Sequence, residues 1–227
     1  MRFAEPRRDR NFQDTRIRFR FSRNEAASGV AHSAQIKEFR RRALASGLPC
    51  CGNTVPKMSF GPALSEGCSS LCEFADLYLY EFVMADEAAE KMRQLDDEKF
   101  TLLSANRIPV FFPTVESATN TVRYAIYSDE AVFLQDKLSK FLSMEECPYE
   151  RHKPNGKVQL FDVRKIFQTG DILDGGRTLV LSLAYEEGAN LRPDAAAKAI
   201  FGQEISIGMV VRQELLWRDS KGNYNVF

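Results

Sequence analysis

The sequence predicts an α+β protein in which strands and helices follow the same order twice along the chain. Residues 16–110 have the pattern strand, helix, strand, strand, helix, strand, and residues 121–217 have much the same pattern. The strands show apolar alternation or aromatic enrichment, the helices are amphipathic, and Gly- and Pro-rich turns separate them. Each pass therefore has the order of a ferredoxin-like βαββαβ unit with an antiparallel sheet. We expect a flexible basic arm at 1–15, a first unit at 16–112 and a second unit at 121–219.

The first unit opens with the strand RIRFRFSR (16–23), in which apolar residues and arginines alternate strictly. Alternation places the two kinds of side chain on opposite faces of a strand, so we expect a half-buried strand with an arginine-bearing outer face. The apolar residues are Ile17, Phe19 and Phe21, and the arginines are Arg16, Arg18 and Arg20.

A helix is predicted at 31–46, where apolar residues recur at helical spacing and Gly47 and Pro49 supply a stop. Its apolar side holds His32, Ile36, Phe39 and Ala43, and its basic arc holds Lys37, Arg40 and Arg41. The rest of the unit is predicted as a short strand in KMSF (57–60), a strand at 73–83, a helix at 86–99, a strand at 100–110 and a link at 111–120.

Similar sequence signals predict the elements of the second unit. Pro193 suits the first position of a helix and Gly202 a helix end. The predicted elements are a strand at 121–128, a helix at 129–145, extended structure at 147–161 that turns at Pro154-Asn155-Gly156, a short helical turn at 162–167, a strand at 177–186, a helix at 193–201 and a closing strand at 205–219.

Composition points to an ordinary globular chain of 227 residues, with 44% hydrophobic and 27% charged residues. No apolar run is long enough to span a bilayer, and the first residues lack the apolar core of a secretory signal. We therefore expect a cytoplasmic protein without membrane contact. Five cysteines, an odd number, are typical of reduced thiols in that compartment.

The net charge of zero hides an asymmetry, because residues 1–42 hold twelve Lys and Arg against five Asp and Glu. Such a basic segment is either a solvated face or a surface for an anionic partner such as RNA. Two further arginines suit anions: Arg164 lies two residues after Asp162, which it could instead brace, and Arg192 precedes a helix start. The candidate anion-binding residues are Arg16, Arg18, Arg20, Lys37, Arg40, Arg41, Arg164 and Arg192.

Several stretches resemble the radical-SAM-linked proteins, a bacterial family of unknown function. They are RIRFRFSR, the helix from His32 to ALASGLP, PKMSFGPALSEG (56–67), KVQLFDVRKIF (157–167) and LRPDAAAKAIFG (191–202), and together they cover residues 16–218. The chain departs from that family at Ala34, where the family has Asp, and in the shorter loop GNTVP (52–56). The resemblance implies a radical SAM protein as partner.

Two residues are candidates for catalysis. His32 is one of only two histidines, and the alternative is that it is a packed residue of its helix. Asp162 is the candidate catalytic carboxylate if the chain is an RNA-modifying enzyme with an architecture related to pseudouridine synthases. No phosphate loop, dinucleotide fingerprint or HExxH motif is present in the sequence.

Four cysteines flank one loop and strand, and thiolates brought together there could hold Zn or an iron–sulfur cluster. They are Cys50, Cys51, Cys68 and Cys72. The alternative, which we favour, is that they are small buried or loop residues and that the protein has no cofactor.

The leading interpretation is an accessory protein that binds an anionic partner or RNA for a radical SAM enzyme, without catalysis of its own. The alternatives are the RNA-modifying enzyme and a cysteine-based metal-binding protein.

Overall fold

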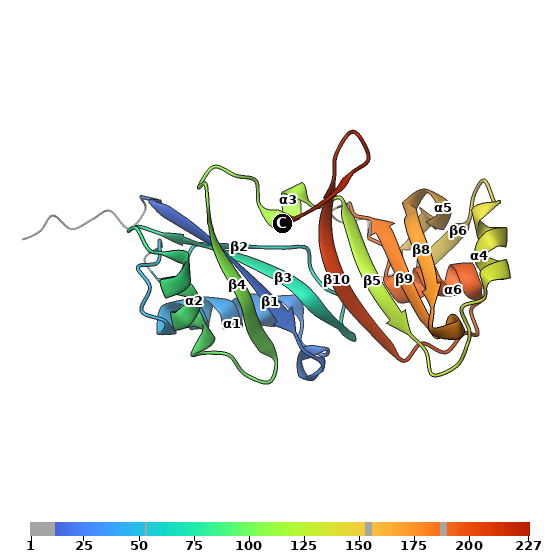
Figure 1. Ribbon diagram of the computed structural model, residues 1–227, viewed down its shortest axis with the longest axis horizontal. Coiled ribbons are helices and arrows are strands. Elements are labelled where there is room, and N and C mark those ends of the chain that lie inside the picture. The colour runs from blue at the N-terminus through green and yellow to red at the C-terminus, as the bar shows by residue number, and fades with distance from the viewer. Residues whose placement is uncertain (1–11, 53, 153–155, 187–189) are drawn as a thin grey trace, which may run out of the picture. The chain divides into compact units, whose positions relative to one another are not determined.

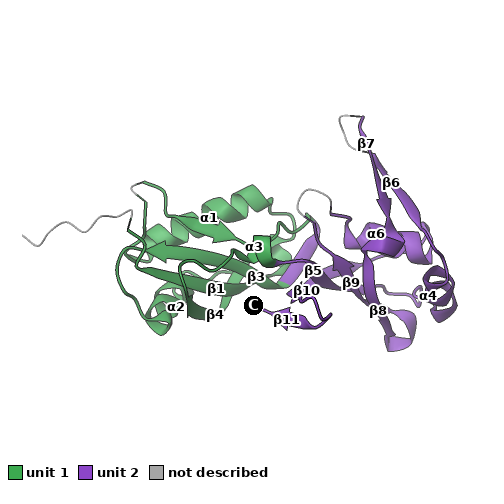
Figure 2. Ribbon diagram, turned by 90° about the horizontal axis from the view of Figure 1, so that it is seen from above, with its two compact units in different colours: residues 1–66, 71–118 green, residues 67–70, 119–227 purple. Residues whose placement is uncertain are grey.

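The computed structural model describes residues 12–52, 54–152, 156–186 and 190–227, so most of the predicted basic arm lies outside the described residues. Two compact units make up the chain (Figure 2). Unit 1 contains the described residues up to Glu66 and those from Leu71 to Ala118, and unit 2 contains Gly67–Ser70 and the described residues from Thr119 onward. No helix of the described residues is long and apolar enough to cross a membrane.

Unit 1 has the predicted order of elements (Figure 1). The strand β1 lies between β4 and β3, and β2 pairs with the other edge of β3, which gives the order β4-β1-β3-β2. The β1–β4 and β2–β3 pairs are antiparallel. The elements are β1 (Thr15–Arg23), α1 (His32–Ala45), β2 (Met58–Phe60), β3 (Cys68–Leu79), α2 (Ala85–Arg93), β4 (Phe100–Ile108) and the short helix α3 (Val115–Ala118).

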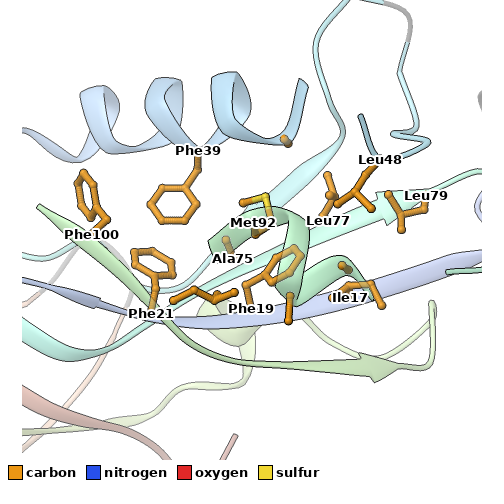
Figure 3. Packing of buried hydrophobic residues seen from close by; sticks show 14 of the residues in the cluster. Ile17, Phe19, Phe21, Phe39, Leu48, Ala75, Leu77, Leu79, Met92 and Phe100 are labelled. Atoms are coloured by element: carbon orange, nitrogen blue, oxygen red, sulfur yellow. The ribbon is translucent and has the colours of Figure 1, made fainter. Parts of the chain in front are cut away.

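The core of unit 1 forms where the apolar face of β1 meets α1 (Figure 3). The Phe21 and Phe39 ring centroids are 4.0 Å apart, and the Phe100 ring meets the Phe39 ring edge-on at 5.5 Å. Ile17 and Phe19 are fully buried in the same cluster. Each such side chain contributes about 1.5–3 kcal/mol of burial free energy. This face of the strand is the one that the alternation predicted.

The opposite face of β1 differs from the prediction. The strand was expected to be half-buried, but Arg16 is 1% exposed and Arg18 is 9% exposed. Residues from the segment after β4 lie against these guanidinium groups and accept hydrogen bonds from them. The alternation therefore identified the two faces correctly, and the prediction that the arginine face is open to solvent was wrong.

Unit 2 has one main sheet in the order β10-β5-β9-β8, in which every neighbouring pair is antiparallel. The first residues of β3 belong to this unit, where Cys68 pairs in parallel with Val210 of β10. The elements are β5 (Thr121–Tyr127), α4 (Gln135–Leu142), β6 (Pro148–His152), β7 (Val158–Asp162), α5 (Val163–Ile166), β8 (Phe167–Leu173), β9 (Thr178–Ala184), α6 (Pro193–Phe201), β10 (Met209–Arg218) and β11 (Tyr224–Val226).

The helices α4 and α6 pack on one face of this sheet. Phe133, just before α4, meets Phe201 of α6 at 5.2 Å, and Phe141 of α4 meets Phe167 at 5.2 Å, both edge-on. The helix α6 begins at Pro193 as predicted and ends at Gly202, whose φ of 119° suits glycine. The helix α4 is shorter than predicted, since it begins only after Leu134.

The extended segment predicted at 147–161 is a separate two-stranded sheet, β6 with β7, and does not join the main sheet. The edge position beside β9 is taken instead by β8, which the sequence did not reveal. Its sequence, FQTGDIL, is mostly polar or glycine, so it lacks the apolar signal of a strand. Gly170 suits this position, because a Cβ atom there would lie in tight contact, 3.0 Å from the Phe167 ring.

Candidate functional site

Arg16 and Arg18 of β1 share the carboxylate of Asp76 on β3. Arg16 Nη2 lies 2.5 Å from Asp76 Oδ2, while Arg18 donates from Nε at 2.8 Å and from Nη2 at 3.0 Å. Arg16 also donates to the carbonyls of Val110 and Phe112, and both arginines donate to the carbonyl of Pro113 at 3.3 Å. The cluster therefore holds the segment after β4 across this face of the sheet, and Arg16 and Arg18 have a structural task.

Arg20, the third arginine of β1, is half-buried and donates to the Leu71 carbonyl at 3.4 Å. It projects from the same face of β1 as Arg16 and Arg18. The helix α1 packs on the opposite face of β1, where its Phe39 contacts Phe21. The arginines of β1 and the basic residues of α1 thus lie on opposite faces of the sheet. They do not form one continuous basic surface.

The solvent side of α1 carries three cations, of which Lys37 and Arg41 are exposed and Arg40 is half-buried. We call Lys37, Arg40 and Arg41 the α1 basic face. Arg41 is bound to Glu38 by two hydrogen bonds of 2.8 and 2.7 Å, which lower the pKa of Glu38 and raise the pKa of Arg41. Lys37 and Arg40 have no ion-pair partner within 4.0 Å in the described part of the chain. One carboxylate therefore faces three cations here.

Arg42, which ends the run Arg40-Arg41-Arg42, leaves this surface altogether. It is 2% exposed, pairs with Asp97 at 2.6 Å and with Glu38 at 2.8 Å, and lies over the rings of Phe39 and Phe100. Asp97 lies in the turn before β4, 55 residues after Arg42. The run of three arginines in the sequence therefore did not indicate that Arg42 forms a buried ion pair. Arg42 fastens α1 to that turn.

His32 is the first residue of α1 and packs edge-on against Phe60 of β2, with ring centroids 6.4 Å apart. The N-terminus of α1 has no acidic residue in its first turn and no side-chain cap. The positive end of the helix dipole therefore lies at His32, and its effect falls off within the first turn, before the α1 basic face begins at Lys37.

Asp162 caps the short helix α5 in unit 2. Its Oδ1 accepts hydrogen bonds from the backbone N–H of Cys147 at 2.9 Å and of Arg164 at 3.1 Å. The first of these bonds is the main cause that lowers the pKa of Asp162, and Lys165, 3.2 Å away, lowers it further. The Arg164 guanidinium instead lies over the Phe141 ring at 5.8 Å, so the expected carboxylate–guanidinium brace is not formed.

Arg192 lies at the N-cap of α6 and binds Asp194 in its first turn, with bonds of 2.9 and 3.3 Å. The Asp194 carboxylate raises the pKa of Arg192. The two candidate catalytic residues, His32 and Asp162, belong to different units, and Arg164 and Arg192 both belong to unit 2. The predicted set thus divides into separate groups.

The four candidate thiols are not brought to one point. Cys50 pairs with Leu79 at the far end of β3, seven residues from Cys72, a span of about 23 Å at the usual rise of a strand. Burial raises the pKa of Cys50 to about 11. Across the described ranges, no group of three or more His, Cys, Asp or Glu side chains is arranged to hold a metal ion. The cysteine arrangement does not fit a four-thiolate centre.

Comparison with known families gives one result. Residues 16–193 match the model of a family described as an uncharacterized protein conserved in bacteria (DUF2344). The chain belongs to this family. The match covers both units in large part, and its description names no radical SAM partner. A comparison with curated proteins gave no match.

Proposed function

We propose that this DUF2344 protein is a binding module that recognises RNA through the α1 basic face of unit 1. The observation that carries the proposal is the surplus of cations there: Lys37 and Arg40 lie about one turn apart, and only Arg41 is held by a carboxylate of its own helix. Residues three and four apart are neighbours on a helix surface, so the charges act together on one phosphate chain.

One further feature favours this reading. Both units have the element order and the strand order of a ferredoxin-like unit, unit 2 with the β6–β7 pair inserted. We take both units to be ferredoxin-like on this basis. The fold by itself does not decide the function.

We assign the chemical modification of the RNA to a partner enzyme. The resemblance of several stretches to radical-SAM-linked proteins supports a radical SAM enzyme in that role, to which this chain would present its RNA. An independent RNA-modifying activity has less support, because two backbone N–H groups occupy Oδ1 of Asp162 and Lys165 Nζ lies 3.2 Å from Oδ2. A general base must reach its substrate's proton, and a carboxylate committed to a helix cap is poorly placed to do so.

Binding of a tRNA pool, followed by fluorescence anisotropy between about 50 and 200 mM salt, tests the proposal. The variant Lys37→Gln/Arg40→Gln removes two charges from the α1 basic face. The matched control Lys140→Gln/Arg177→Gln removes two exposed charges from unit 2. We expect the first variant to bind more weakly and its plot of log affinity against log salt to be shallower by about 1.4, since each lost phosphate contact accounts for about 0.7.

Equal affinities and equal salt slopes for the two variants would show that the α1 basic face is not the RNA-binding surface. Absence of RNA binding by the wild type at low salt would overturn RNA binding itself. Circular dichroism spectra of all proteins check that the fold is intact. Affinity purification from native cells separately tests the enzyme partner, which should appear among the co-purified proteins as a radical SAM protein.

A further inference from the structure

A polar cavity of about 380 Å³, widely open to solvent, lies in unit 2 where β10 turns into β11. Its lining comes from the start of β5, from β8 and from the β10–β11 turn. The lining residues are Asn120, Thr121, Gln168, Arg218, Asp219, Ser220 and Gly222. A cavity of this size takes a small ligand about as large as a nucleotide.

The frame around the cavity is built by two side chains that bind backbone. Asn120 donates from Nδ2 to the Arg218 carbonyl at 2.9 Å and accepts from the Arg218 N–H at 2.8 Å. The Asp219 carboxylate accepts from the N–H groups of Lys221 and Asn223, both at 2.9 Å, and from the Asn223 side chain at 3.0 Å. These bonds fix the turn, and they hold the one acidic side chain of the lining in the turn itself.

Arg218 is an exposed residue of the lining, and an amide and an aromatic ring contact its guanidinium. Nη1 donates to Gln168 Oε1 at 2.6 Å, and the group lies 5.5 Å from the centre of the Tyr224 ring. Gly222, with a φ of 89°, lies beside it in the turn, and a Cβ atom there would be in ordinary van der Waals contact with Nη2 at 3.6 Å. In the described residues no carboxylate lies within 4.0 Å of this guanidinium. An arginine placed by an amide and a ring, without a carboxylate partner, is suited to an external oxyanion.

We propose that Arg218 binds the phosphate group of a small ligand in this cavity. The planar fork of the guanidinium matches two phosphate oxygens, and the Ser220 hydroxyl in the same lining can donate to a third. The site belongs to unit 2 and uses none of the residues of the α1 basic face. The two proposals therefore stand or fall separately.

Fluorescence of Trp217, the one tryptophan of the chain and the residue before Arg218 on β10, offers an indirect readout, since it lies outside the cavity lining. The full chain is titrated with AMP, adenosine and inorganic phosphate at about 100 mM salt, and AMP binding is checked by calorimetry. We expect AMP to bind and adenosine not to bind. Arg218→Gln should weaken AMP binding about 10- to 100-fold, the range of a charge-assisted hydrogen-bonding group. Arg177→Gln, which removes an exposed arginine elsewhere in unit 2, should leave it unchanged.

Binding of inorganic phosphate that is lost in Arg218→Gln also supports the site and identifies free phosphate as a source. Adenosine binding as strong as AMP binding, equal AMP affinity of Arg218→Gln and wild type, or no binding of any probe would each overturn the proposal. Gln168→Ala is a second variant, because it removes the amide that positions the guanidinium and leaves its charge. It should weaken AMP binding by less than Arg218→Gln does, and an equal or larger loss would contradict the role given to Arg218.

Discussion

Replacement of Asp76 by Asn should strongly destabilise unit 1. Asp76 is 1% exposed and is the carboxylate to which both Arg16 and Arg18 bind. Asn has almost the same volume, so the change opens no cavity and removes mainly the charge. Loss of one partner from a buried ion pair costs about 3–5 kcal/mol, because the remaining charge stays buried. Domains are typically stable by about 5–15 kcal/mol, so the change removes a large part of the total.

The measurement is urea unfolding combined with hydrogen exchange of peptides from β1 and β3, which reports on unit 1 separately from unit 2. Glu90→Gln, an exposed change on α2, is the control and should stay within about 0.5 kcal/mol of the wild type. In the double variant Arg16→Gln/Asp76→Asn, the loss should be smaller than the sum of the two single losses, since one buried cation is gone. A loss below about 1 kcal/mol for Asp76→Asn, with unchanged exchange in β1, would refute this account of the cluster.

Three further results are expected. The pKa of Asp162 is lowered in the folded state, so the ionised carboxylate stabilises the fold above the ordinary carboxyl pKa range. This stabilisation fades as the pH falls through the pKa of the folded state. The difference in melting temperature between wild type and Asp162→Asn should therefore shrink between about pH 5 and about pH 2. Cys50, with a pKa of about 11, should react with iodoacetamide at about pH 8 at least about tenfold more slowly than a free cysteine, as followed by peptide mass spectrometry. Gly176→Ala should cost about 1–3 kcal/mol by calorimetry, because φ is 94° and the new Cβ atom would lie 2.9 Å from the Phe133 carbonyl.

The sequence predicted unit 1 well because its signals are local. Strict alternation in β1, the helical spacing in α1 and the glycine after it depend only on neighbouring residues. The α+β class and the order of elements followed from them. In unit 2 the same reasoning missed β8, whose polar residues gave no strand signal and whose Gly170 lies against the ring of Phe167 in the same strand. It predicted extended structure at 147–161 but did not reveal that β6 and β7 form a sheet of their own.

For the candidate site, too, local sequence signals predicted only part of the arrangement. The sequence alone determined which side chains share a face: Ile17, Phe19 and Phe21 on one side of β1, its arginines on the other. Only the tertiary structure decided what covers each face. Asp76 lies 58 residues from Arg18, and the Phe112 carbonyl lies 96 residues from Arg16. Alternation fixes the direction of a side chain along its own strand, whereas burial of its charge depends on partners that the fold brings from elsewhere. For this reason the arginines of β1, which the sequence suggested as a binding surface, mainly bind Asp76 and the segment after β4. The surplus positive charge lies on α1.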